Sequence, residues 1–184
     1  HFFEHLFFTG TKTYPTEGRL RKRHQEIGLT IGAFTQHDHI EVNGSCPKED
    51  TKNALFIVKE MIFESLLHKS MIEKERTVIL NEERQRQDNN YVKLWNNTYT
   101  ARFKKGNALQ FPIEGKVDSI SNITEEQLIK FYKTHCVPTN VTLIVGSCLE
   151  FEYLEKHIRS IFEKLPKSTK IKQPVITNKS MTGF

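Results

Sequence analysis

Two short segments in which apolar and polar residues alternate constrain the fold of this chain most. They are LTIGAFT at residues 29–35 and HIEVNGS at residues 39–45. An alternation with a period of two residues is typical of β-strands, and these segments are close enough in the sequence to form adjacent strands. Most of the other apolar residues recur at helical spacing, so the chain is predicted to form a layered α+β or α/β domain.

Helical patterns account for much of the remaining chain. The longest runs from residue 70 to about residue 105 and is roughly three times the average helix length, so we expect a break near residues 88–90. Thr124 followed by Gln127 resembles a capping box and predicts a helix that runs to His135. The other expected helices cover residues 1–8, 14–28, 49–67 and 150–165.

Two segments in the last third of the chain also favour extended structure. The run NVTLIVG at residues 140–146 is apolar and rich in β-branched residues, so it is predicted to be a buried strand. The polar segment 166–184 contains PVIT, which favours a short final strand. A length of 184 residues is enough for one domain with a core and hardly enough for two.

Composition argues against several classes of protein. No apolar run approaches the roughly 20 residues of a membrane-spanning helix. The net charge of +5 comes from Lys and Arg residues spread along the chain, which favours a solvated surface over a nucleic-acid interface. The three cysteines form no CxxC pair, so Cys46, Cys136 and Cys148 are expected to be small core residues.

The first five residues, His-Phe-Phe-Glu-His, suggest a metal site. His1 and His5 are four residues apart, so on a helix their imidazoles project from one face and can bind one metal ion. Glu4 lies beside them, within reach of a metal-bound water. The alternative is that these residues fell together by chance at the start of a helix, because a pattern with three fixed positions is suggestive but not decisive.

A third ligand is expected from the segment EKERTVILNEE. Glu75 and Glu82 are seven residues apart, so they lie on one stripe of a helix together with Val78 and Ile79, which should face the core. Acidic residues on such a stripe are unusual, and a catalytic zinc needs three protein ligands with one position left open. The alternative is a charged solvent face, which Glu83, Arg84 and Arg86 also favour.

These motifs resemble a known family. HFFEHLFFTGT resembles the inverted HxxEH zinc motif of the pitrilysin, insulin-degrading enzyme and mitochondrial processing peptidase family, and ERTVILNEE resembles its downstream helix. Glu82 follows His5 by 77 residues, the separation expected for the third ligand. The resemblance covers about residues 1–148 and continues more weakly to residue 165. Further segments that match in order are GAFT, NALQFPIEG, SISNITEEQLIKFYKTH and VPTNVTLIVG.

The resemblance implies a role for each residue of these motifs. His1, His5 and Glu82 would bind Zn²⁺, and Glu4 would be the general base that takes a proton from a zinc-activated water. Glu75 matches an additional acidic position of the family and would orient a ligand and tune the charge of the site.

The resemblance also implies a substrate-binding strand. Gly32, Ala33, Phe34 and Thr35 resemble the family's Asn-Ala-x-Thr edge strand, to which a substrate peptide adds as an extra strand through main-chain hydrogen bonds. Gly32 stands where the family has Asn. A side-chain amide expected to contact the substrate is therefore absent from this chain.

The fold and partners implied by the resemblance follow from the architecture of the family. The fold would be an α+β structure of the α/β roll type, with helices packed on one side of a mainly antiparallel sheet. Residues 1–165 would form the catalytic domain, lacking its N-terminal part, and residues 166–184 a linker or the first strand of a following domain. A second homologous half or subunit would close over the peptide substrate, so the isolated chain would cleave peptides poorly.

Two functions stay open at this point. The first is a zinc endopeptidase domain, and the second is a non-catalytic peptide-binding or assembly subunit of the same family. Subunits of the second kind tend to lose the motif, whereas all five acids and histidines are present here. The compartment is left open between cytoplasm, periplasm and organelle.

Overall fold

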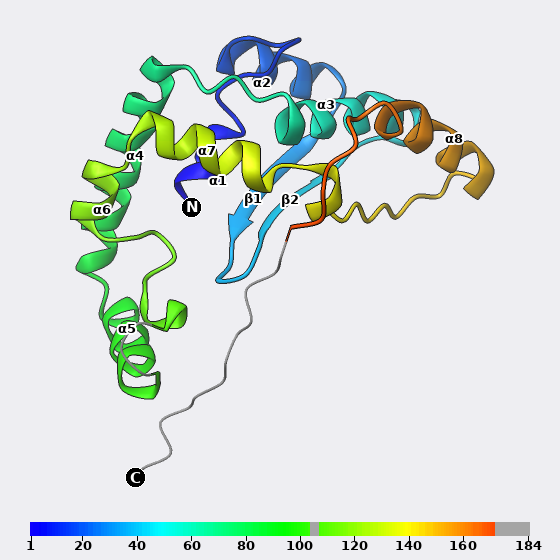
Figure 1. The fold of residues 1–184 in the computed structure, drawn as a ribbon. Coiled ribbons are helices and arrows are strands. Elements are labelled where there is room, and N and C mark those ends of the chain that lie inside the picture. The colour runs from blue at the N-terminus through cyan, green and yellow to red at the C-terminus, as the bar shows by residue number, and fades with distance from the viewer. Residues whose placement is uncertain (104–106, 172–184) are drawn as a thin grey trace.

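A computed structural model of the chain describes residues 1–103 and 107–171. The chain folds as a helix-rich domain around one small sheet (Figure 1). The helices are α1 (Phe2–Leu6), α2 (Glu17–Glu26), α3 (Thr51–Phe63), α4 (Lys69–Gln87), α5 (Asn90–Arg102), α6 (Val117–Asn122), α7 (Glu125–His135) and α8 (Phe151–Phe162). The strands are β1 (Thr30–Thr35) and β2 (Ile40–Ser45), and short 3-10 turns lie at Lys48–Asp50, Ala108–Gln110 and Pro138–Asn140.

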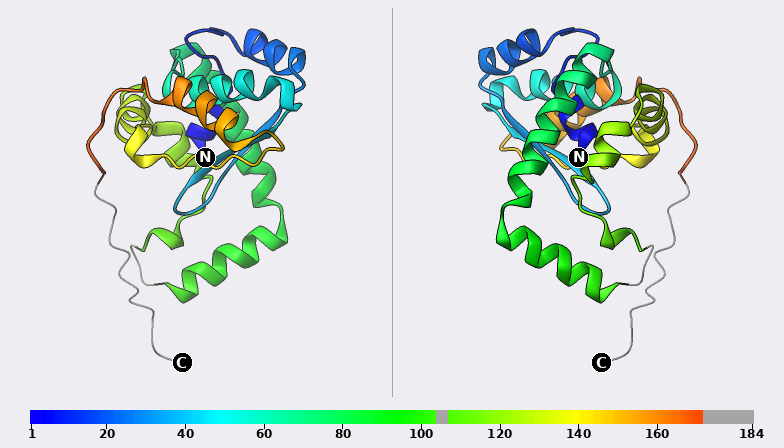
Figure 2. Two further views of the ribbon diagram at one scale, coloured as in Figure 1. Left: turned by 90° about the vertical axis from the view of Figure 1, so that its right-hand side faces the viewer. Right: turned by 90° about the vertical axis from the view of Figure 1, so that its left-hand side faces the viewer.

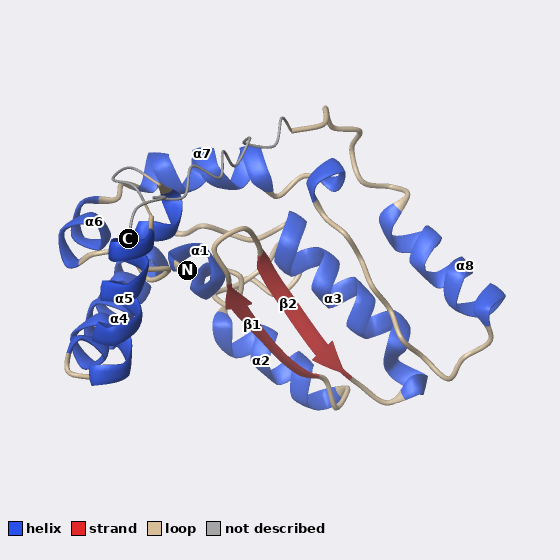
Figure 3. Cartoon of the chain, turned by 90° about the horizontal axis from the view of Figure 1, so that it is seen from below, coloured by secondary structure: helices blue, strands red, loops and turns tan. Residues whose placement is uncertain are grey.

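The two alternating segments form an antiparallel pair, as the sequence predicts. The register runs from Thr30 opposite Ser45 to Thr35 opposite Ile40. Helices α1 and α2 both contact β1, and α2 and α3 flank the hairpin (Figure 3). The α+β class is therefore confirmed, and the sheet is antiparallel as the family resemblance implies.

The first helix is short, but it is anchored by the core. Phe2, Phe3 and Leu6 on α1, together with Phe7 just after it, expose less than a tenth of their surface. Burial of such side chains is worth about 1.5–3 kcal/mol each, so tertiary packing stabilises a helix that is too short to form alone. The rest of the buried cluster comes from Leu20, Ile27, Leu29, Ala54, Ile57, Met61, Ile72, Ile79, Ile120 and Leu128.

The loop after α1 requires a glycine. Gly10 has φ of +144°, and a Cβ at this position would lie 2.9 Å from the carbonyl carbon and oxygen of Pro15. The carbonyl of Gly10 accepts a hydrogen bond from the backbone N–H of Leu66, and the N–H of Lys12 donates to the carbonyl of Glu64. These contacts fasten the end of α1 to the segment after α3.

One arginine of helix α4 contacts both α1 and α6. The guanidinium of Arg76 lies 5.3 Å from the centre of the Phe2 ring on α1. It also donates hydrogen bonds to the carbonyls of Ile120 and Ile123 at the end of α6. Arg76 therefore links α4 to both α1 and α6.

The break expected in the long helical pattern is confirmed. Helix α4 ends at Gln87, and α5 starts at Asn90. Asn89 is the N-cap residue of α5, and its side chain accepts a hydrogen bond from the backbone N–H of Tyr91. Figure 2 shows α5 lying across the tip of the hairpin, away from the central helices. None of its described residues is buried. The end of the pattern expected near residue 105 falls outside the described residues.

The capping box at the start of α7 is also confirmed. The Thr124 hydroxyl accepts from the backbone N–H of Gln127 at 3.2 Å, and the Gln127 side chain accepts from the N–H of Thr124 at 2.8 Å.

Along the described residues, the structure contains no helix that is both long and apolar enough to cross a bilayer.

The prediction of a buried strand at residues 140–146 is wrong. Asn140 ends a 3-10 turn, residues 141–146 form no strand, and Ile144 is 89% exposed. An apolar run becomes a buried strand only where a neighbouring strand accepts its hydrogen bonds. Cys148 is exposed rather than part of the core, whereas Cys46 and Cys136 pack against the core. The PVIT strand lies outside the described residues.

Candidate metal centre

Helix α1 presents its two histidines side by side. His1 is the N-cap residue and His5 lies one turn later, so both side chains leave the same face. Their rings meet edge to face, with centroids 4.9 Å apart. The opposite face of α1 carries the buried Phe2, Phe3 and Leu6, which fixes the direction of the histidine face.

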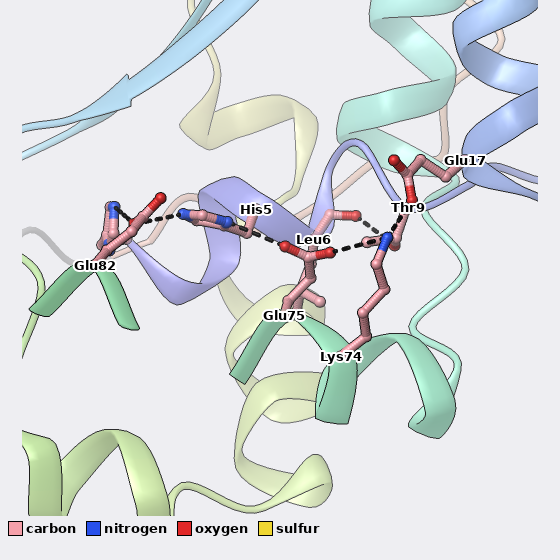
Figure 4. Close-up of polar contacts among 8 residues, drawn as sticks. His5, Leu6, Thr9, Glu17, Lys74, Glu75 and Glu82 are labelled. Carbon is pink, nitrogen blue, oxygen red and sulfur yellow. Dashed lines mark hydrogen bonds and ion pairs between the residues drawn. The ribbon is translucent and has the colours of Figure 1, made fainter. Parts of the chain in front are cut away.

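Helix α4 brings Glu82 to the same point. Glu82 Oε2 lies 3.4 Å from His5 Nε2 and 3.8 Å from His1 Nε2 (Figure 4). One ligand atom from each of the three side chains can be chosen so that all lie within 4.8 Å of one another. Two imidazole nitrogens and one carboxylate oxygen are a ligand set that suits catalytic zinc, which keeps a further position open. The donor chemistry therefore fits the metal that the motif predicts.

Glu75 lies on the other side of His5. Its Oε2 is 3.1 Å from His5 Nδ1, and its side chain is only 12% exposed. Because a carboxylate only accepts hydrogen bonds, this contact places the proton of the neutral imidazole on Nδ1 and leaves the Nε2 lone pair directed toward Glu82. Lys74 Nζ lies 3.8 Å from Glu75 Oε1 and also pairs with Glu17. Figure 4 shows this polar row from Glu17 to Glu82.

The burial of the residues beside Glu75 and Glu82 on α4 differs in part from the prediction. Ile79 is fully buried as expected, but Val78 is 37% exposed. Glu83, which favoured a charged solvent face, is buried at 7% exposure, and its carboxylate accepts a hydrogen bond from Gln87. Both acids of the predicted motif nevertheless point at α1, because α4 packs directly against that helix.

Glu4 is held by a residue of β1. The Thr35 hydroxyl donates a hydrogen bond of 2.5 Å to Glu4 Oε2. Thr35 is one of the residues predicted to bind substrate through the main chain, and its side chain contacts the predicted general base. No sequence pattern predicts this pairing, since the two residues are 31 positions apart and meet only because α1 packs beside β1.

The other residues of the predicted substrate strand lie along β1. Gly32 and Ala33 pair with Asn43 and Val42 of β2, and Phe34 is 37% exposed. Within residues 1–103 and 107–171, β1 pairs with no strand other than β2.

A hollow of about 410 Å³ opens beside the candidate metal-ligand cluster of His1, His5 and Glu82. Arg86 and Glu114 form an ion pair at its wall. Sequence reasoning did not assign either residue to the site. Arg86 could have been assigned to the site from the sequence, because it follows Glu82 by one helical turn. Glu114 could not, because it lies in a loop far from Glu82 in the sequence. The lining residues are His1, Glu82, Gln85, Arg86, Asn89 and Glu114.

Comparison with known proteins decides the family. The sequence model of the insulinase family, peptidase family M16, matches residues 1–117. This chain belongs to that family. The match includes α1 and α4, the two helices that carry the histidines and acids of the cluster.

Individual relatives agree with this assignment. Mitochondrial-processing peptidase subunit beta of Dictyostelium discoideum is 28% identical over 97% of this chain and 38% of that protein. The probable zinc protease PqqL of Escherichia coli strain K12 is 29% identical over 90% of this chain and 18% of that protein. The crystal structure of a protease from Helicobacter pylori shares the fold, with a TM-score of 0.86 and 21% identity over 98% of this chain and 43% of that one. The chain thus spans less than half the length of these relatives.

Proposed function

We propose that this chain is the zinc-binding catalytic part of an M16 metalloendopeptidase. The observation that carries the proposal is the convergence of His1, His5 and Glu82 from two helices, with Glu4 on the same short helix. Relatives named as zinc proteases support the choice of metal and reaction. His1 Nδ1 is buried and has no hydrogen-bond partner within the described part of the chain, whereas the Nε2 atom of the same ring faces Glu82.

The residues divide the chemistry between them. His1, His5 and Glu82 would hold Zn²⁺, which when bound would lower the pKa of a coordinated water toward about 7 and polarise the scissile carbonyl. Glu4 accepts a proton from the attacking water and returns it to the leaving amine. Thr35 holds the Glu4 carboxylate through its hydroxyl, which limits the orientations that Glu4 can adopt.

The substrate binds as an added strand. A peptide aligned on the edge of β1 that does not pair with β2 would exchange main-chain hydrogen bonds with residues 32–35. Thr35 at the end of β1 also contacts Glu4, so a peptide on this edge would pass close to the proposed base. Gly32 contributes no side-chain hydrogen bond, so recognition at this point depends on the backbone.

The complete enzyme would need a second half. The chain covers 38% of the Dictyostelium relative, which leaves room for further domains in proteins of this family. We assign residues 1–165 to the catalytic domain and residues 166–184 to a linker or the start of a following domain. Closure by a homologous half or subunit would exclude water and orient the peptide.

Metal removal tests the proposed function. We expect the complete protein to contain about one zinc ion per site, to hydrolyse unfolded peptides, to lose this activity on dialysis against a chelator, and to regain it when zinc is restored. Zinc content is measured by atomic absorption and cleavage by mass spectrometry. Zinc binding without any hydrolysis would instead favour a non-catalytic subunit, and activity that survives complete metal removal would overturn the proposal.

A second prediction concerns Glu75 and the affinity for zinc, not peptide hydrolysis itself. Glu75→Gln keeps an acceptor oxygen but removes the charge beside His5, so zinc affinity should fall about 10–100-fold, as is typical when the hydrogen-bond partner of a ligating histidine is changed. Competition with a chromophoric chelator measures the change. Glu126→Gln is the control, because Glu126 is an exposed acid in the first turn of α7 and lies outside the cluster. Equal affinities for the two variants would exclude this role for Glu75.

A further inference from the structure

We infer that Arg86 makes the hollow beside the metal-ligand cluster a subsite for an acidic side chain of the peptide substrate. The inference rests on the proposed function, because the hollow has a specificity role only if a peptide is cleaved or bound there. The predicted metal ligands His1 and Glu82 line the hollow, so a substrate side chain inside it belongs to a residue close to the scissile bond.

Arg86 is placed to receive an anion. It follows Glu82 by one turn of α4, so both side chains lie on the same face of the helix. Its Nη1 donates to Glu114, while its Nε is buried and has no hydrogen-bond partner among the described residues. A guanidinium carries five N–H donors in a planar fork that matches a carboxylate, so its pairing with Glu114 leaves donor capacity unused.

The two members of the ion pair differ in exposure. The Glu114 side chain is 10% exposed and that of Arg86 is 40% exposed, so the hollow presents the cation and covers the anion. A lysine from the substrate would meet Arg86 before it could reach Glu114. With a divalent metal bound, the metal and Arg86 bring three positive charges to the hollow, and Glu82 and Glu114 bring two negative charges. The charged groups that line the hollow then carry one net positive charge. The charge balance therefore favours an acidic side chain.

A tight turn holds Glu114 in position. The backbone N–H of Gly115 donates to the carbonyl of Pro112 at 3.0 Å, and Gly115 has φ of +89°, which a glycine adopts without strain. The turn fixes the covered carboxylate, and the carboxylate in turn orients the Arg86 guanidinium toward the hollow. Gln85 and Asn89 also line the hollow, so no further charged side chain competes with Arg86 and Glu114 on that side.

Paired peptides test the subsite. In each pair one position near the cleavage site is Glu or Gln, and binding to the zinc-loaded complete protein that carries Glu4→Gln is followed by fluorescence anisotropy. We expect the Glu peptide to bind about tenfold more tightly at one position, in line with a charge-assisted hydrogen bond. Arg86→Gln should reduce that ratio to within about twofold, whereas Arg84→Gln, an exposed arginine of the same helix outside the hollow, should leave it unchanged.

A second variant separates specificity from structure. Glu114→Gln releases the guanidinium from its partner and should increase the preference for Glu peptides, whereas a purely structural ion pair predicts that both variants weaken Glu and Gln peptides equally. Equal weakening, or no position with a Glu-to-Gln ratio above about twofold, would overturn the inference. Because binding is measured without turnover, this result is independent of hydrolysis. Absence of hydrolysis in the zinc-loaded parent protein would instead contradict the proposed function.

Discussion

Replacement of Glu4 by glutamine should abolish peptide hydrolysis while the protein keeps its zinc and its fold. Glutamine has nearly the same shape as glutamate but cannot take a proton from the attacking water, and a general base typically contributes 10²–10⁴-fold to the rate. The Thr35 hydroxyl can still donate to the amide oxygen of the new side chain, so the local contact persists. Activity is measured as kcat/KM on a peptide, with zinc content determined on the same samples.

An exposed glutamate provides the control for this substitution. Glu126→Gln in the first turn of α7 removes the same charge away from the cluster, so it should leave kcat/KM unchanged. If Glu4→Gln kept activity within about threefold of the parent protein, far less than a general base contributes, Glu4 would not be the base. Loss of zinc by the same variant would instead mean that Glu4 holds the metal or supports its ligands.

Local geometry explains why much of the cluster could be predicted. The spacing of His1 and His5 fixes a shared face as soon as those residues are helical, and the same rule places Glu75 and Glu82 on one face of α4. Their assignment as ligands stays a prediction. The contact between α4 and α1 depends on tertiary packing. From the sequence alone, it could be expected only from the acidic residues in an apolar stripe and from the family resemblance.

The contacts that sequence reasoning missed all depend on tertiary packing. Thr35 reaches Glu4 because β1 lies beside α1, and Glu114 reaches Arg86 through a turn stabilised by Gly115. The same cause explains the error at residues 140–146, where apolar composition predicted burial but no described strand lies alongside. Periodicity reports which face of a segment is apolar, but not whether another element covers that face.

Replacement of Glu82 by alanine should remove zinc without unfolding the protein. The Glu82 side chain is 44% exposed, so its loss should change the stability of the metal-free protein by no more than about 0.5 kcal/mol. Two imidazoles alone hold zinc poorly, and we expect affinity to fall by more than the 10–100-fold that loss of an outer partner costs. Titration against a competing chelator measures this change, with Asn81→Ala, an exposed neighbour on α4, as the control.

Thermal unfolding with and without zinc provides an independent measurement of the same substitution. A ligand present at 100 times its dissociation constant stabilises the folded state by about 2.7 kcal/mol, so the parent protein should melt at a higher temperature when zinc is added. Glu82→Ala should lose this increase and melt as the metal-free parent does, because zinc then has no preference for the folded state. A full zinc-dependent increase in Glu82→Ala would remove Glu82 from the ligand set and leave Glu75, on the far side of His5, as the acid to examine next.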